Sequence, residues 1–279
     1  MALKCGIVGL PNVGKSTLFN ALTSAKALAA NYPFATKEPN LGVITVPDKR
    51  LDQLSDIVRP QKVQPTTVEI LDIAGLIKGA SKGEGLGNQF LANIREVDAI
   101  IHVIRCFQDD NVVHVDGSIN PVRDKDVIDT ELQLKDIETL EKRLDKIQKA
   151  AKTGDKAAKA TFDLGQRMLA HLGDGNNARS LDLTEEEALE IKEFQLLTGK
   201  PILYVCNVDE DSAVSGNEYS AAIKELVAAE NAQVVIISAG IEADIAELET
   251  KEERLEFLEA IGLSEPGVNK IISAAYRLL

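Results

Sequence analysis

The fold of this chain is decided by the stretch GLPNVGKST, residues 9–17. Its first eight residues match G-x-x-x-x-G-K-[ST], the phosphate-binding loop or P-loop. The motif requires a strand before it and a helix after it. The apolar run from Leu3 to Val8 predicts the strand, and the segment from Lys15 to Thr23 predicts the helix. We therefore expect a phosphate-binding site at this turn.

The residue types of the loop suit phosphate chemistry. Glycines let backbone N–H groups converge on an anion, and the helix N-terminus adds a partial positive charge. Lys15 can reach the β- and γ-phosphates, Ser16 can ligate Mg²⁺, and Thr17 can bond an earlier phosphate. The predicted phosphate-binding residues are Asn12, Val13, Gly14, Lys15, Ser16 and Thr17.

Two further segments predict switch elements. The run Asp72-Ile73-Ala74-Gly75 closes an apolar strand, so Asp72 would lie near Mg²⁺ and the Gly75 N–H would face the γ-phosphate. Thr36 lies in the loop after the first helix and could add a second hydroxyl ligand to Mg²⁺. The predicted metal ligands are thus Ser16, Thr36 and Asp72.

Outward from these motifs, short apolar runs alternate with amphipathic segments. This alternation predicts an α/β fold with a mostly parallel sheet covered on both faces, and the loop motif makes it a P-loop NTPase. Further strands are expected at 41–46, 67–73, 99–104, 201–206 and 233–237, and further helices at 49–58, 88–97, 219–229, 251–261 and 267–278.

The segment 128–199 departs from this alternation of apolar runs and amphipathic segments. Ile137, Leu140, Leu144 and Ile147 repeat at spacings of three and four, which predicts a helix that packs against a partner helix. We expect a helical coiled-coil hairpin at 128–199, inserted into a nucleotide-binding domain of residues 1–127 and 200–279. The alternative is that these helices extend the main core.

The runs GLPNVGKST (9–17), NYPFATKEPN (31–40) and DIAGLIKGASKGEGLGNQFL (72–91) resemble the Obg-like group of translation-factor GTPases. The stretch HVIRCFQDDNVVHVDG (102–117) and the helical insertion resemble its YchF subfamily, the Obg-like ATPases, more closely. The resemblance implies a G domain, a helical hairpin and a C-terminal TGS domain, which we expect to be absent from this chain. It also implies the ribosome or a ribosomal subunit as partner.

The base is expected to lie near Asn207-Val208-Asp209-Glu210, where GTPases of this fold carry N-K-x-D. Val208 replaces the lysine that packs on the base, and Glu210 replaces the aspartate that accepts two bonds from guanine. Losing these two hydrogen bonds costs about 1–3 kcal/mol of the binding free energy of GTP. ATP loses little, because adenine lacks both donors. We therefore predict that ATP is preferred over GTP, with Asn207, Val208, Glu210, Ser238 and Ala239 on the base side.

Hydrolysis needs a group that orients water, and Leu76 stands where many such enzymes have a glutamine. The resemblance supports His114 for this role, and the predicted catalytic residues are His114, Lys15 and Gly75. The alternative is that His114 is a surface residue of a mobile loop. In related enzymes an asparagine at the position of Asn12 helps to hold K⁺, so K⁺ is a second candidate cofactor beside Mg²⁺.

Composition limits the remaining choices. The formal net charge of −13 argues against a general nucleic-acid coat protein, although a local basic patch remains compatible with it. Cys5, Cys106 and Cys206 fit no metal or disulfide pattern and are expected to be buried thiols. We expect a cytoplasmic monomer with no membrane anchor and no direct DNA binding.

These observations favour a molecular switch that binds and slowly hydrolyses ATP. The second interpretation is an ordinary GTPase. Glu210 and Val208 disfavour it, because they replace residues that bind guanine. A third is an interaction scaffold in which nucleotide only stabilises the fold.

Overall fold

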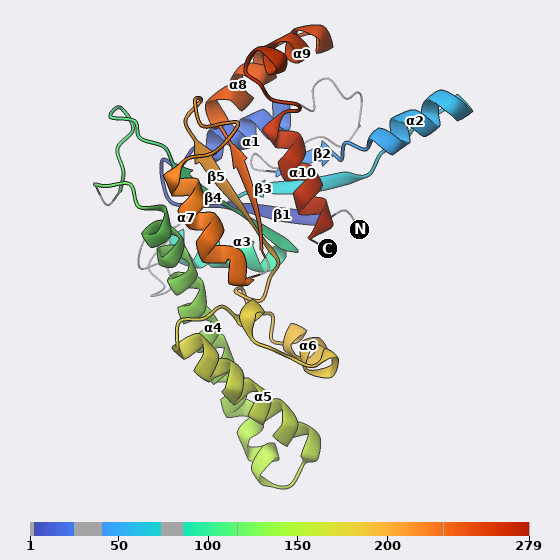
Figure 1. The fold of residues 1–279 in the computed structure, drawn as a ribbon. Coiled ribbons are helices and arrows are strands. Elements are labelled where there is room, and N and C mark those ends of the chain that lie inside the picture. Colours follow the sequence, from blue (N-terminus) through green and yellow to red (C-terminus); the bar gives the residue numbers. More distant parts are fainter. Residues whose placement is uncertain (1–2, 25–40, 74–85, 116, 231, 279) are drawn as a thin grey trace.

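The structure is a computed structural model that describes residues 3–24, 41–73, 86–115, 117–230 and 232–278. A six-stranded sheet with strand order β2-β3-β1-β4-β5-β6 lies at its centre (Figure 1). All neighbouring strands are parallel except β2 and β3. The strands are β1 Leu3–Val8, β2 Leu41–Thr45, β3 Thr67–Asp72, β4 Ala99–Cys106, β5 Ile202–Val208 and β6 Gln233–Ile237. The predicted α/β fold with a mostly parallel sheet is confirmed.

Two neighbouring interior strands, β4 and β5, are buried along their whole length, as the interior strands of a parallel sheet should be. Both have near-continuous apolar sequences, AIIHVIRC in β4 and ILYVCNV in β5. Cys106 and Cys206 lie in these strands, and they and Cys5 are free and buried, as predicted. Burial raises the pKa of Cys5 to about 12.

Helices cover both faces of the sheet (Figure 1). On one face α1 and α10 contact the strands, and on the other α3, α4 and α7 do. Within the described segments, no helix is both long and apolar enough to cross a bilayer. The α-helices are α1 Lys15–Ser24, α2 Lys49–Val58, α3 Leu86–Glu96, α4 Pro121–Lys152, α5 Lys156–Gly173, α6 Glu185–Lys192, α7 Glu218–Leu226, α8 Ala239–Glu247, α9 Lys251–Ala260 and α10 Gly267–Arg277, with 3-10 turns η2 Ala178–Ser180 and η3 Val227–Glu230.

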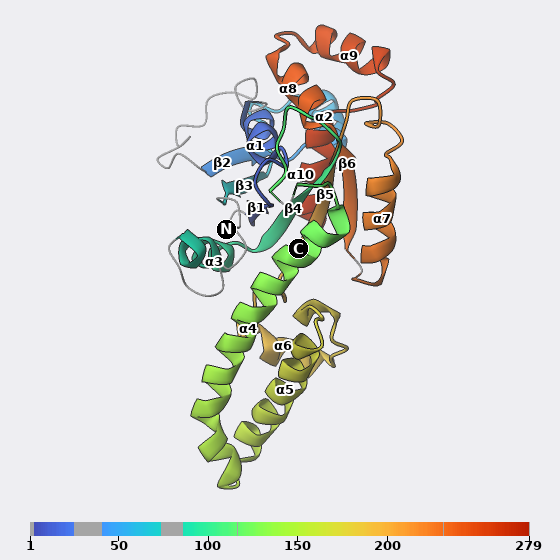
Figure 2. The ribbon, with the colours of Figure 1, turned by 90° about the vertical axis from the view of Figure 1, so that its left-hand side faces the viewer.

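Helices α4 and α5 extend away from the sheet as an antiparallel pair (Figure 2). Helix α4 starts at Pro121 rather than near residue 128, because Asn120 caps it and Pro121 occupies the first turn. Its backbone passes through position 128 without a break, and Ile128 and Leu132 pack in the main core. The predicted domain boundary therefore falls inside a continuous helix, and the division into two domains stays a prediction.

Beyond Leu132 the hairpin has an apolar cluster of its own. It is formed by Leu140, Leu164, Met168, Leu172, Ala178, Ile191, Phe194 and Leu196. Gly165 lets the two long helices approach closely, since a Cβ there would lie 2.5 Å from a Leu144 methyl group. The Thr184–Glu187 capping box that starts α6 is present, as the spacing predicts.

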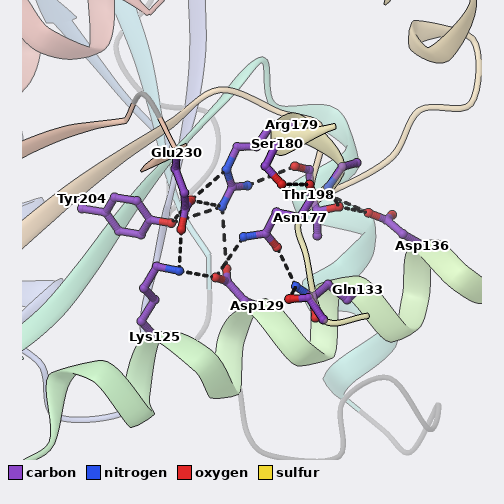
Figure 3. A network of polar contacts seen from close by, with 12 residues as sticks. Lys125, Asp129, Gln133, Asp136, Asn177, Arg179, Ser180, Thr198, Tyr204 and Glu230 are labelled. Atoms are coloured by element: carbon purple, nitrogen blue, oxygen red, sulfur yellow. Dashed lines mark hydrogen bonds and ion pairs between the residues drawn. The ribbon is translucent and has the colours of Figure 1, made fainter. Parts of the chain in front are cut away.

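A buried polar network joins this hairpin to the sheet (Figure 3). Lys125 of α4 bonds Asp129 at 2.6 Å and Glu230 at 2.7 Å. Arg179 bonds the same Glu230 at 3.0 Å, and the Tyr204 hydroxyl of β5 donates to it at 2.8 Å. Two cations thus face two carboxylates where α4, η2, β5 and η3 meet.

In this network each charged group stabilises the ionised form of its neighbours. Burial alone would lower the pKa of Lys125, but Asp129 and Glu230 raise it above its ordinary value. Burial alone would raise the pKa of Asp129, but Lys125 and Arg179 lower it. All four groups are therefore ionised around neutral pH. Buried charges are tolerated when paired in this way, so the network holds the base of the hairpin in one arrangement on the sheet.

Candidate functional site

The P-loop connects the end of β1 to α1 and lines a cavity of about 340 Å³. Gly14 has φ +90°, a conformation that favours glycine, and a Cβ there would lie 2.2 Å from Nδ2 of Asn207. Its carbonyl accepts the first α1 bond from Leu18 N at 2.9 Å. Ser16 and Thr17 are exposed along the cavity wall. The strand, turn and helix that the motif requires are therefore present.

Lys15 points from the loop to the end of β3. Its Nζ lies 3.0 Å from Oδ1 of Asp72, and both side chains are largely buried. Strands β1 and β3 pair in parallel with Ile7 opposite Asp72, which brings the two motifs together. A bound phosphate would compete with Asp72 for the Lys15 ammonium.

The oxygen ligands near the loop fit a magnesium ion. The Ser16 hydroxyl and the Asp72 carboxylate are hard donors of the kind that Mg²⁺ takes beside nucleotide phosphates. When bound, the ion would offset negative charge on the phosphates. The other predicted switch residues, Thr36 and Gly75, lie outside the described residues.

On the base side, one buried side chain connects two loops. Asn207 Nδ2 donates to the Val13 carbonyl at 2.9 Å, and its Oδ1 accepts from Ala239 N at 2.8 Å. The parallel pairing of β5 and β6 places these loops at the same edge of the sheet as the P-loop. Asn207 thus positions the P-loop against the start of α8, and we assign it a positioning role.

The other predicted base-side residues differ in accessibility. Val208 is 2% exposed and packs in the main core, so in this structure its side chain has a packing role. Glu210 is exposed, with Oε1 close to Gly240. Ser238 is the N-cap of α8 and Ala239 its first residue. Helix α8 is an element that the sequence pattern did not predict.

His114 is buried, so the alternative of a surface histidine in a mobile loop is wrong. It is 8% exposed, and its Nε2 lies 2.9 Å from Oδ2 of the buried Asp124 in the first turn of α4. The other oxygen of Asp124 accepts from the Arg123 guanidinium at 2.9 Å. A carboxylate on one ring nitrogen holds the orientation of an imidazole.

The loop that carries His114 contacts the P-loop directly. Asn12, which has φ +62°, donates from Nδ2 to the Val113 carbonyl at 3.0 Å. Asn12 is exposed, and this bond leaves its Oδ1 as the side-chain atom suited to a cation. Asn12 therefore holds the residue next to His114 at the edge of the phosphate cavity.

Arg105 organises the same loop and was missed from the sequence. Its guanidinium is 1% exposed at the end of β4 and donates to the carbonyls of Phe107, Asp109 and Val112. It also lies 4.5 Å from the Phe107 ring centroid. A lone arginine inside the apolar run of β4 was the available signal, because a charge in a central strand needs several buried partners.

A phosphate loop on a mostly parallel sheet, with an acidic side chain at the end of the adjacent strand, defines a P-loop NTPase with the fold of a G domain. A family model described as "50S ribosome-binding GTPase" matches residues 4–153. The chain is 55% identical to the ribosome-binding ATPase YchF of Escherichia coli O157:H7, across all of this chain and 76% of that protein. It belongs to the YchF family.

Two further comparisons agree. The ribosome-binding ATPase YchF of Bacillus subtilis (strain 168) is 52% identical over 281 residues, again with all of this chain and 76% of the relative covered. The solved structure of the Schizosaccharomyces pombe YchF GTPase superposes with a TM-score of 0.87 at 36% identity, covering 99% of this chain and 75% of that one. The helices that flank the sheet therefore belong to the family fold.

Proposed function

We propose that this chain binds and slowly hydrolyses ATP with Mg²⁺, accepts GTP less well, and uses its nucleotide state to regulate an interaction with the ribosome. The observation that carries the proposal is the assembled phosphate site, in a chain more than half identical to proteins named as ribosome-binding ATPases. In that site the Lys15 ammonium donates to the Asp72 carboxylate, and the Asn207 amide donates to the Val13 carbonyl of the P-loop. The ribosome as partner rests on the names of those relatives.

The preference for ATP rests on Glu210. Its exposed carboxylate lies beside Gly240 at the start of α8, and the N–H of the preceding residue, Ala239, donates to Asn207. At this position an aspartate would reach guanine with both oxygens, and one extra methylene displaces that pair. An unpaired guanine donor costs about 1–3 kcal/mol, which corresponds to about a tenfold to hundredfold loss of GTP affinity.

The competing GTPase function is supported by the matching family of 50S ribosome-binding GTPases and by the Schizosaccharomyces pombe relative, which is described as a GTPase. Equilibrium titration of the chain with fluorescent ATP and GTP analogues in Mg²⁺ separates the two functions. Tighter ATP binding supports the proposal, and tighter GTP binding replaces it with a GTPase. Turnover that equals that of Lys15→Ala would instead leave only the scaffold interpretation.

The substitution Glu210→Asp sharpens this test. We expect it to raise GTP affinity about tenfold and to leave ATP affinity within about twofold, because only guanine offers two donors to the shortened carboxylate. Glu225→Asp makes the same chemical change on an exposed face of α7 and should alter neither affinity. Equal effects on both nucleotides would show that Glu210 does not read the base.

We also propose that His114 orients the attacking water. Asp124 and Arg123 hold its ring from one side, and the Asn12–Val113 bond holds its loop on the P-loop. The Asn12 oxygen is the proposed ligand for K⁺, which would offset charge in the transition state. Equal hydrolysis rates in KCl and NaCl would exclude that cation.

A further inference from the structure

Two loops at the carboxyl edge of the sheet follow neighbouring strands. Strands β4 and β5 pair in parallel, and their last residues, Cys106 and Val208, lie opposite each other. Residues 107–115, the His114 loop, follow β4, and residues 209–217, the base-side loop, follow β5 and carry Glu210. The group proposed to orient water and the group proposed to read the base therefore lie on adjacent loops.

The side chain of Asn217 bonds these two loops together. Its Nδ2 donates to the Cys106 carbonyl at the end of β4, at 2.7 Å. Its Oδ1 accepts from Ser220 N at 3.1 Å and so caps α7. One amide thus fixes the end of the base-side loop and the start of the His114 loop relative to each other.

A second bond joins the same segments nearer the surface. Gln108 Nε2 donates to the Tyr219 hydroxyl at 2.7 Å. Gln108 lies two residues after Cys106, and Tyr219 lies two residues after Asn217, so the two bonds are successive cross-links. Because Tyr219 also packs against the main core, the second bond holds the His114 loop on a fixed partner.

The base-side loop is a compact turn. Ala213 N donates to the Glu210 carbonyl at 3.1 Å. Gly216 N donates to the Ser212 carbonyl at 2.7 Å, which closes the rest of the loop. A shift of Glu210 would therefore be carried along the loop to Asn217 rather than absorbed between them.

The His114 loop is held in a similar way by the buried guanidinium of Arg105. This side chain donates to the Asp109 carbonyl at 3.2 Å and to the Val112 carbonyl at 2.9 Å. Asp109 follows Gln108 directly, and Val112 lies two residues before His114. The position of Gln108 is therefore tied to the position of the imidazole.

We propose that the base-side loop controls the rate of hydrolysis through these two cross-links. Asn217, Gln108 and Tyr219 are then positioning residues that act through the imidazole of His114. The inference rests on the proposed ATP hydrolysis and on the proposed role of His114. A base that fits Glu210 badly lowers the rate as well as the affinity, because a small displacement of a water-orienting group is costly.

The test is single-turnover hydrolysis of saturating ATP and GTP by Asn217→Ser. Serine keeps an N-cap for α7 but has no amide to donate to the Cys106 carbonyl. We expect the ATP rate constant to fall about threefold to tenfold, as for one lost hydrogen bond, and the ATP dissociation constant to stay within about twofold. Thr184→Ser likewise leaves a serine cap, on α6, and is the matched control that should change neither.

The ratio of the ATP rate to the GTP rate provides a second readout. It should fall towards 1 in Asn217→Ser, because the fit of the base no longer reaches the imidazole. His114→Ala provides a third readout: in that background Asn217→Ser should cause no further loss of ATP rate. An unchanged ratio, or a further loss of the same size without the imidazole, would overturn the proposal.

The exposed cross-link gives an independent test with little risk to folding. Gln108→Ala and Tyr219→Phe should each slow ATP hydrolysis about twofold to fivefold. The double variant should lose no more than the stronger single change, because both changes remove the same bond. Tyr276→Phe, on the half-exposed tyrosine of α10, is the matched control and should leave the rate unchanged. Additive losses in the double variant would contradict the coupling.

Failure of this inference can be told apart from failure of the proposed function. Hydrolysis by the unmodified chain that is no faster than that of Lys15→Ala would refute both together. Hydrolysis that depends on Lys15 but is unchanged in Asn217→Ser and in Gln108→Ala would refute the inference alone and leave the proposed function in place.

Discussion

At the scale of single residues, the site depends on side chains that act on other parts of the chain. Asn207 uses both ends of its amide to hold the P-loop against α8. Arg105 satisfies three carbonyls of the loop that carries His114. Without touching nucleotide, Asn207 can control the position of the P-loop and Arg105 that of the loop that carries His114.

His114→Ala should lower kcat several-fold and leave the dissociation constant for ATP nearly unchanged, because the imidazole is proposed to orient water rather than to bind nucleotide. Single-turnover hydrolysis and fluorescence titration measure the two quantities. Asp124→Asn should also lower kcat, because the Asp124 carboxylate holds the imidazole ring of His114 in place. His171→Ala, in α5 of the hairpin, is the matched control and should leave kcat unchanged. An unaltered kcat in His114→Ala would remove His114 from the mechanism.

His102 predicts a pH dependence of stability. It is 1% exposed in β4, and burial lowers its pKa from 6.5 to about 4, with Asp129 opposing and Lys125 assisting the shift. The unfolded chain therefore binds more protons between these values, and stability is lost as the pH falls from 6.5 towards 4. The loss approaches about 3 kcal/mol at 1.36 kcal/mol per pH unit.

The measurement is urea unfolding of the unmodified chain and of His102→Phe across this pH range. Phenylalanine does not titrate, so the difference in unfolding free energy should shrink or reverse in favour of the variant as the pH falls. If the unfolding free energies of the two proteins changed with pH by the same amount, the protonation of His102 would not change on unfolding.

At the scale of elements, the hairpin is joined to the sheet by charges as well as by apolar packing. Helix α4 contributes Ile128 and Leu132 to the main core and Lys125 and Asp129 to the polar network (Figure 3). The hairpin therefore cannot change its angle at this end without breaking buried ion pairs. The network makes α4 a stiff connection between the sheet and the distal hairpin.

Lys125→Met should destabilise the chain by about 3–5 kcal/mol, since it leaves Asp129 and Glu230 buried with Arg179 as their remaining cation. Chemical unfolding at pH 7 measures this change. Lys159→Met removes an exposed pair with Asp163 on α5 and should cost at most about 1 kcal/mol. Adding Asp129→Asn to Lys125→Met should recover part of the loss; an equal or greater loss in the double variant would contradict the charge argument.

At the scale of the whole molecule, one site is assembled from distant parts of the sequence. The P-loop, Asp72, Val113 and Asn207 meet at one edge of the sheet because their strands run parallel and end there. The hairpin extends from the same sheet through α4 (Figure 2). Nucleotide bound at this site would therefore lie against segments that the chain separates by many residues.

This arrangement predicts stabilisation by nucleotide. At an ATP concentration of about 100 times the dissociation constant, Mg²⁺-ATP should add about 2.7 kcal/mol to the unfolding free energy of the whole chain. Differential scanning calorimetry with increasing ATP measures the rise in Tm. Lys15→Ala should abolish the rise, because it removes the phosphate contact. A rise of the same size in that variant would place ATP elsewhere on the molecule.

The fold class and the strand–turn–helix around the P-loop motif could be predicted from the sequence alone. Local signals were sufficient there, since the P-loop carries its strand, turn and helix within about 20 residues. The bounds of β1, α2 and β6 agree residue by residue with those predicted, because apolar periodicity and turn residues act over short distances.

Features that depend on residues far apart in the chain could be seen only in the folded structure. It showed that α4 starts at Pro121, that α8 follows Ser238, that Val208 faces the core and that His114 is buried on Asp124. The physical reason is that burial and ion pairing are set by which elements pack together. The charges of Lys125 and Glu230 look like surface charges in the sequence, and only packing makes them interior contacts.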